Sequence, residues 1–270
     1  MSFYISLSGL KNAQSQLGVT AHNIANAETT GFKKSRVQFS DIVAGSAYSN
    51  PKLIAGIGGT VEAIGQNFAL GPIEQTGSAL DIAINGSGFF TTVSPQSGQT
   101  TFTRNGSFTG DEQGFITDAA GSRLQGFPTD AAGAVTSATP GDIQLPAANA
   151  AGASFAGLTV SGDGNVLVSF ADGTSEVVGK VALATFTAPQ GLLQVGSSNW
   201  QATGLSGTPT YGQPADAEFG SLLSGSLERS NVDIAEELVS LIAAQRYFQA
   251  NAKAIDTATQ ISQTIINLRT

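Results

Sequence analysis

Cysteine is absent from this chain of 270 residues, and histidine, methionine and tryptophan occur once each. Without cysteine, disulfide bonds, thiolate metal sites and thiol nucleophiles are excluded. The single histidine, His22, excludes a zinc site with two histidine ligands from one chain. The composition therefore predicts no metal site and removes most kinds of catalytic site.

Charge is also scarce, at 12% of residues, and 12 Lys and Arg stand against 20 Asp and Glu. Nucleic-acid binding needs clustered basic side chains, so no nucleic-acid partner is expected. No apolar run approaches the ~18 residues of a membrane-spanning helix, and no basic segment followed by an apolar core opens the chain. We expect neither membrane insertion nor a cleaved signal peptide.

The charges are spread unevenly along the chain. Residues 1–52 carry five basic and two acidic side chains, residues 53–227 carry three and thirteen, and residues 228–270 carry four and five. The middle of the chain is therefore acidic, whereas the two ends carry nearly balanced or positive charge.

The N-terminal segment has the apolar period of a helix. Phe3, Leu10, Leu17 and Ile24 are spaced by seven, with Leu7 beside them. A stripe this narrow is typical of a coiled coil. The pattern stops before Gly31, which predicts that the helix ends there.

The C-terminal segment predicts a second helix. Ser230 and Asp233 resemble a capping box with Asp in the place of Glu. Behind them Ile234, Leu241 and Phe248 continue a seven-residue spacing. This spacing is again typical of a coiled coil.

A helix packed on its own domain's core is the simplest explanation of such stripes. Here the polar face of the first helix holds amides and hydroxyls, with Lys11 as its only charge. A solvated helix usually carries more Glu and Lys, whereas uncharged polar groups can be buried against further helices. We therefore expect the stripe residues to be buried against further helices: Phe3, Leu7, Leu10, Leu17, Ile24, Ile234, Leu238, Leu241, Phe248, Ile255 and Ile265.

The middle of the chain predicts antiparallel β structure. Residues 80–84 alternate between apolar and polar, Asn85-Gly86 forms a hairpin-type turn, and residues 88–93 make a further strand. Short strands with turns this regular favour a sandwich or a barrel. The fold class is therefore α+β, with long terminal helices around a central antiparallel all-β domain.

No group of residues supports catalysis or cofactor binding. His22 has no carboxylate or serine at helical spacing to activate. The Asp-Gly pairs lack the further ligands of a calcium loop, and Gly56-Ile57-Gly58-Gly59 lacks the context of a dinucleotide site. We expect a protein that is not an enzyme and has no cofactor.

Four stretches resemble motifs of the bacterial flagellar rod and hook protein family. Residues 23–33 and 225–233 are similar to its N- and C-terminal motifs, and residues 80–90 and 102–108 are similar to its central β domain. The motif residues of the two terminal stretches are Asn26, Gly31, Phe32, Ser230, Asn231, Val232 and Asp233.

The resemblance implies a three-part organisation. The helices of residues 1–30 and 228–270 would pair as a coiled coil and form a helical core that lines an axial channel. Residues 31–75 and 198–227 would be extended linker or hinge segments, and residues 76–197 the outer β domain. Copies would assemble into a tubular homopolymer, with the eleven stripe residues at the interfaces between subunits.

The resemblance also implies a place in the flagellum. Residues 1–4, 33–41 and 267–269 look most like a hook subunit, which transmits motor torque to the filament. A length of 270 residues leaves no room for the outer domain common in hook subunits and is closer to that of a distal rod subunit. We expect a short hook subunit that lacks the outer domain, with a distal rod subunit as the alternative. The implied partners are adjoining rod and hook–filament junction proteins, the hook cap and the flagellar export apparatus, and the implied location is the hook or basal body. A secreted adhesin-like module is the remaining alternative, suggested by the acidic β body.

Overall fold

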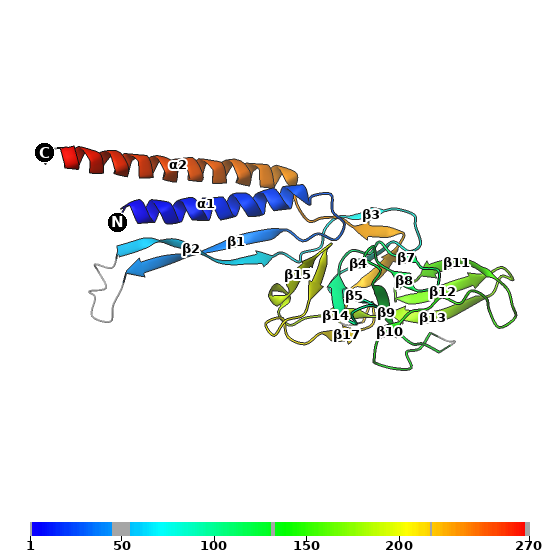
Figure 1. The fold of residues 1–270 in the computed structure, drawn as a ribbon. Coiled ribbons are helices and arrows are strands. Elements are labelled where there is room, and N and C mark those ends of the chain that lie inside the picture. Colours follow the sequence, from blue (N-terminus) through cyan, green and yellow to red (C-terminus); the bar gives the residue numbers. More distant parts are fainter. Residues whose placement is uncertain (1, 45–54, 131–132, 217, 268–270) are drawn as a thin grey trace. The chain divides into compact units, whose positions relative to one another are not determined.

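A computed structural model describes residues 2–44, 55–130, 133–216 and 218–267. The fold is α+β, with one helix near each end of the described chain and antiparallel strands between them, as the sequence predicts (Figure 1). The helices are α1 (Ser2–Ala25) and α2 (Ile234–Asn267). The strands are β1 (Ser35–Ala44), β2 (Ala55–Gln66), β3 (Ile73–Gln75), β4 (Ile82–Asn85), β5 (Phe89–Val93), β6 (Thr100–Thr103), β7 (Thr109–Gly110), β8 (Ile116–Thr117), β9 (Arg123–Phe127), β10 (Gly141–Asp142), β11 (Phe155–Val160), β12 (Asn165–Phe170), β13 (Ser175–Val181), β14 (Leu183–Thr185), β15 (Leu193–Gly196), β16 (Asn199–Gln201), β17 (Thr210–Gly212), β18 (Ser221–Ser224) and β19 (Ser226–Glu228).

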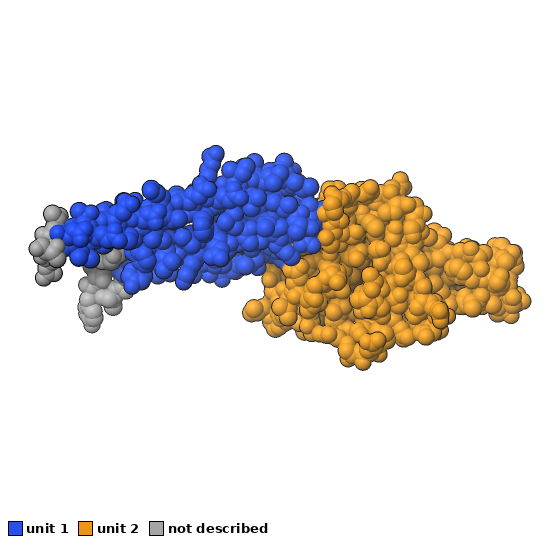
Figure 2. All heavy atoms as spheres, turned by 45° about the horizontal axis from the view of Figure 1, so that its top comes forward, with its two compact units in different colours: residues 1–27, 34–67, 232–270 blue, residues 28–33, 68–231 orange. Residues whose placement is uncertain are grey.

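The chain divides into two compact units (Figure 2). Unit 1 contains residues 1–27, 34–67 and 232–270, and unit 2 contains residues 28–33 and 68–231. By sequence, unit 1 holds seven basic and six acidic residues, and unit 2 holds five and fourteen. The formal charge is therefore +1 for unit 1 and −9 for unit 2, so unit 2 accounts for the acidity of the chain.

Unit 1 consists of the two helices and a hairpin of β1 and β2. The helices run antiparallel side by side, and the hairpin lies against α1 (Figure 1). Near one end of the helix pair, Asn23 Nδ2 donates a hydrogen bond to Glu237 Oε2 at 3.2 Å. The backbone N–H of Gly59 on β2 donates to Ser8 Oγ at 3.3 Å, which ties the hairpin to α1.

Unit 2 is dominated by one large antiparallel sheet. Its main path runs β11-β12-β13-β9-β5-β6-β16-β15, and two further two-stranded sheets pair β18 with β4 and β19 with β3. One core cluster is built around Ile82, Phe90 and Leu183. A second is built around Trp200, which is fully buried against Phe89.

A five-residue hairpin loop recurs in unit 2. In the loop that begins at Asp118, the backbone N–H groups of Ala120 and Ser122 donate to Asp118 Oδ1 at 2.9 and 2.8 Å. Gly121, the fourth residue, has φ +77°. This geometry is typical of a hairpin loop in which a left-handed residue, usually glycine, follows a turn. Loops with the same bonds begin at Asp111 and Asn149.

The units differ from the segments predicted from the sequence. Residues 31–75, expected as an extended linker, contain β1 and β2, and these two strands pair with each other along nearly their whole lengths. Residues 198–227, also expected as a linker, contribute β16 to β19 to the sheets of unit 2. The linker prediction missed this pairing because glycine-rich strands such as β2 lack the alternation that identifies a strand.

Candidate functional site

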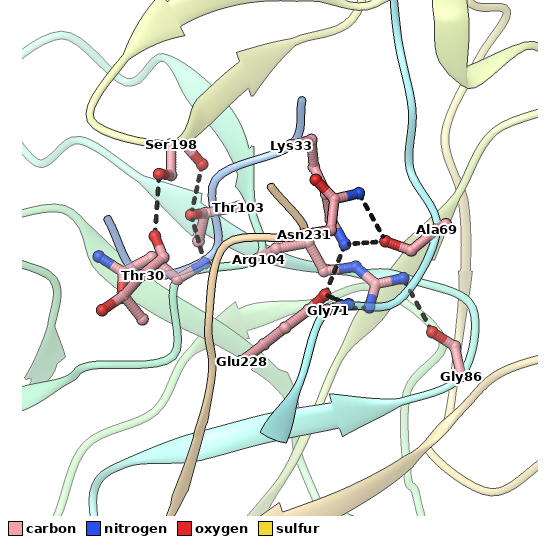
Figure 3. Close-up of polar contacts among 11 residues, drawn as sticks. Thr30, Lys33, Ala69, Gly71, Gly86, Thr103, Arg104, Ser198, Glu228 and Asn231 are labelled. Carbon is pink, nitrogen blue, oxygen red and sulfur yellow. Dashed lines mark hydrogen bonds and ion pairs between the residues drawn. The ribbon is translucent and has the colours of Figure 1, made fainter. Parts of the chain in front are cut away.

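Three charged side chains of unit 2 meet in its interior, and two of them belong to the terminal motifs. This buried ion cluster consists of Lys33, Arg104 and Glu228 (Figure 3). Lys33 comes from the N-terminal motif, Glu228 ends β19 in the C-terminal motif, and Arg104 follows β6. The cluster therefore joins segments almost 200 residues apart in the sequence.

The Glu228 carboxylate lies at the centre of the cluster and is fully buried. Its Oε1 accepts hydrogen bonds from Lys33 Nζ at 2.5 Å and from the Gly71 N–H at 2.8 Å. Its Oε2 accepts from Arg104 Nη1 at 3.2 Å. Both carboxylate oxygens are thus hydrogen-bonded, as a buried charge requires.

The two cations also use backbone carbonyls. Lys33 Nζ donates to the Ala69 carbonyl at 2.8 Å, and Arg104 Nη2 donates to the Gly86 carbonyl at 2.9 Å. Arg104 also lies over the Phe89 ring, with its Cζ 5.4 Å from the ring centroid. These contacts partly replace the water that the two cations would otherwise bind, in a cluster that has one carboxylate for two cations.

Burial governs the electrostatics of the cluster. Removal from water lowers the pKa of Lys33, and Glu228 opposes this shift while the positive charge of Arg104 adds to it. Burial likewise lowers the pKa of Arg104. Because Glu228 opposes both shifts, it is the group that stabilises the two buried charges.

Gly31 and Phe32 of the N-terminal motif pack against the same region. The Gly31 N–H donates to the Glu228 carbonyl at 2.8 Å, and Phe32 is buried. Gly31 has φ +67°, and a Cβ at this position would lie 2.5 Å from the Asn105 nitrogen. Only glycine fits here without a backbone shift, which explains the residue type at this motif position.

A second set of polar contacts holds the turn between β15 and β16. Ser198 Oγ donates to the Thr30 carbonyl at 2.9 Å, and Thr103 Oγ1 donates to the Ser198 carbonyl at 2.8 Å (Figure 3). The N-terminal motif is thus bound to unit 2 both at the ion cluster and at this turn.

The remaining motif residues organise the ends of the helices and the backbone near them. Asn26 Nδ2 donates to the His22 carbonyl at 2.9 Å, after the last turn of α1. Asn231 Nδ2 donates to the Ala69 carbonyl at 3.0 Å, and Val232 is half-buried.

Capping of α2 differs from the sequence prediction. Asp233 is the cap, because its Oδ1 accepts from the N–H groups of Ala235 and Glu236 at 2.8 and 3.2 Å. Ser230 was predicted to open a capping box, but it lies four residues before the helix begins and is buried. An acidic cap at this end also suits the helix dipole.

The eleven predicted interface residues are partly or largely exposed in the single chain. Phe3, Ile234, Leu238 and Ile265 are exposed, with Ile265 at 60%. The other seven are half-buried: Leu7, Leu10, Leu17, Ile24, Leu241, Phe248 and Ile255. Among the described residues of the two helices, those that are buried are small or polar instead, namely Ala13, Thr20, Asn23, Glu237 and Ala244.

The ion cluster could not be predicted from the sequence. Lys33, Arg104 and Glu228 all stand inside stretches that resemble the family motifs, yet nothing in their spacing shows that they meet. A usable indication was the presence of charged residues beside apolar motif residues in a chain with so little charge.

The described residues contain no group of three His, Asp or Glu side chains that could hold a metal ion. None of the described helices has an apolar stretch of the length that a membrane span needs.

Comparison with known proteins gives three family matches. Residues 3–33 match the model described as flagella basal body rod protein, residues 83–168 match the flagellar hook protein FlgE/F/G D1 domain, and residues 223–268 match the flagellar basal body rod FlgEFG protein C-terminal region.

Several characterised relatives align along the whole chain. The flagellar basal-body rod protein FlgG of Bacillus subtilis is 35% identical over 279 residues, which cover 99% of this chain and 98% of the relative. FlgG of Caulobacter vibrioides is 35% identical and covers 97% of each chain. The flagellar hook protein FlgE of Salmonella typhimurium is 26% identical over 411 residues and covers both chains fully.

Proposed function

Because this chain belongs to the flagellar rod and hook protein family, we propose that it is a subunit of the distal rod of the flagellar basal body. The family is structural and not enzymatic, in agreement with the prediction from composition. Its members polymerise in the axial structure of the flagellum.

Length is the observation that carries the choice of rod over hook. The rod relatives of Bacillus subtilis and Caulobacter vibrioides align with this chain over almost their full length and with similar numbers of residues. The hook relative needs an alignment of 411 residues against a chain of 270, at lower identity. The hook, which the terminal residues favoured in the sequence analysis, is therefore the second candidate.

The terminal helices are the proposed assembly elements. The spacing of Leu241, Phe248 and Ile255 by seven, together with their half-burial, supports pairing of α1 and α2 as a coiled coil. The exposed Phe3, Leu238 and Ile265 would then pack on neighbouring copies. A contact of this kind, repeated between identical subunits without closing, produces an open helical tube.

The proposed partners follow from the position in the flagellum. Neighbouring copies would be the main partner, with adjoining rod and hook proteins at the two ends of the segment. Delivery would use the flagellar export apparatus.

Electron microscopy of the polymer tests the proposal. Purified chain should form straight tubes if it is a rod subunit, whereas curved tubes would favour the hook. A chain that forms no tube at any concentration would contradict both.

A truncated chain provides the control. Deletion of residues 1–26 should abolish the polymer, because it removes the apolar stripe of α1, yet leave unit 2 folded. Fluorescence of the single tryptophan, Trp200, reports on unit 2 because this residue is fully buried in its core. A truncated chain that still polymerised would contradict the role assigned to the helices.

A further inference from the structure

A buried polar contact joins the two helices of unit 1. Asn23 and Glu237 are both buried, and Asn23 Nδ2 donates a hydrogen bond to Glu237 Oε2 at 3.2 Å. The same amide holds the first residue of β1, because Nδ2 donates to the Ser35 carbonyl and Oδ1 accepts from the Ser35 N–H, each at 2.9 Å. The Asn23 side chain therefore connects α1 both to β1 and to α2.

A second contact between the helices depends on the size of the residues. Gly9 of α1 faces Asn251 of α2, and a Cβ at position 9 would lie 2.5 Å from Asn251 Oδ1. Fourteen residues separate this contact from the first along α1, and fourteen separate the two contacts along α2. Because the helices run antiparallel and fourteen residues are two heptads, both contacts belong to one register, that is, to one alignment of the residues that lie opposite each other.

The apolar stripes do not specify this register by themselves. Leu10 and Leu17 on α1, like Leu241 and Phe248 on α2, are spaced by seven, so a slip of seven residues again places stripe against stripe. Since α2 has 34 residues and α1 has 24, α1 could slip towards the C-terminal end of α2 and still pair along its whole length. A competing register is thus available to this helix pair.

The slipped register loses both contacts. It would place Asn23 opposite the buried Ala244 and leave Glu237 past the end of α1. Asn251 would lie opposite Gln16, where no glycine leaves room for it. Polar residues buried between helices fix register in this way, because a slip leaves a buried polar group without its partner.

We propose that Asn23 and Glu237 determine the register of the helix pair and exclude the alignment that is shifted by seven residues. Gly9 and Asn251 favour the same register through their close fit. The proposal goes beyond the proposed function, because it concerns the fold of a single chain and does not depend on whether the polymer is a rod or a hook.

Disulfide trapping measures the register in the free chain. The chain lacks cysteine, so paired substitutions introduce the only thiols. Gly9→Cys with Asn251→Cys reports the observed register and should form an intramolecular disulfide on mild oxidation, because Asn251 Cγ, which a sulfur would replace, lies 2.9 Å from a Cβ at position 9. Gly9→Cys with Ala258→Cys reports the slipped register and should give little disulfide.

A substitution on α2 removes the polar contact alone. Glu237→Leu leaves Asn23 both of its bonds to Ser35, and it should raise the yield of the slipped disulfide by about tenfold or more. Glu237→Gln keeps an acceptor oxygen for Asn23 and should keep the observed register. Glu236→Leu, which removes an exposed acid from the same turn of α2, is the matched control and should not raise that yield.

Thermal unfolding separates register from stability. A contact that only stabilised the helix pair would, when removed, lower the temperature at which helical circular dichroism is lost and reduce the yield of both disulfides. A contact that sets register behaves differently, because an apolar residue can replace a buried polar one without loss of stability. Glu237→Leu should therefore keep or raise that temperature while the slipped disulfide increases.

Three outcomes would overturn the proposal. If the Glu237→Leu chain formed only the disulfide of the observed register, the connections of the chain would be enough to fix the alignment. A strong slipped disulfide with Glu237 in place would show that the polar contact does not exclude the slip. If neither disulfide formed, the helices would not pair in the free chain, and the proposed polymer would still be open to its own test by electron microscopy.

Discussion

At the scale of single residues, Glu228 combines a negative charge with complete burial. Its carboxylate is fully buried and is shared by Lys33 and Arg104, so it is the only anion for two buried cations in the ion cluster. Removing one partner of a buried ion pair costs far more than the pair itself contributes, because an uncompensated charge is left behind.

This asymmetry predicts different effects for substitutions on the two sides. Glu228→Gln leaves both cations without an anion and should lower the free energy of unfolding of unit 2 by about 3–5 kcal/mol. Lys33→Met leaves a neutral Arg104–Glu228 pair, and the Ala69 carbonyl keeps its bond from Asn231. The free energy of unfolding lost in Lys33→Met should be less than half of that lost in Glu228→Gln. Urea denaturation followed by Trp200 fluorescence measures both, and equal losses would contradict this account.

The ion cluster also shows what a sequence lacks at this scale. Gly31 could be predicted to break a helix, because glycine has that effect in any chain. Its close approach to Asn105 could not, because that contact joins segments more than 70 residues apart. The same holds for Lys33 and Glu228, whose meeting depends on the complete fold.

At the scale of elements, the start of α2 is set by Asp233. Its side chain accepts two backbone N–H groups that the helix itself cannot satisfy. The sequence indicated a cap in this region and misplaced it by three residues, because Ser, Asn and Asp in one short run are all good caps.

Loss of this cap should weaken the helix measurably. Asp233→Ala should reduce the stability of α2 by about 1 kcal/mol and lower the helical content of the monomer. Asp256→Ala, which removes an exposed acid from the middle of the same helix, is the matched control and should change it much less. Far-ultraviolet circular dichroism during thermal unfolding makes the comparison, and equal effects would contradict the capping role.

A strand could be predicted from the sequence where the turn beside it could be recognised. Asp-Gly and Asn-Gly pairs mark hairpins because glycine accepts the left-handed conformation that these turns need. Strand β2, with the sequence around Gly56-Ile57-Gly58-Gly59, has few side chains to alternate, and its place beside β1 depends on packing against α1.

At the scale of the whole molecule, the two units differ in how completely they bury their apolar side chains. Unit 2 has two apolar core clusters, whereas the helices of unit 1 leave much of their apolar stripe exposed. A long helix without a covered apolar face is only marginally stable in water.

The monomer should therefore unfold in more than one step. Helical circular dichroism should be lost at a lower temperature than Trp200 fluorescence changes, because the first reports mainly on unit 1 and the second on unit 2 alone. Assembly should raise the temperature at which helical circular dichroism is lost, towards or above the temperature at which Trp200 fluorescence changes. Coincident transitions in the monomer would contradict the independence of the units.

The recurring hairpin loop of unit 2 has a practical consequence for protein engineering. The loop at Asp118 is closed by bonds from its own side chain and backbone, with exposed Ala119 and Ala120 between them. Since these bonds involve the backbone and Asp118 only, a substitution at the exposed tip should leave the loop and the sheet undisturbed. A fluorophore attached through Ala119→Cys would then mark each subunit for microscopy while leaving the fold intact.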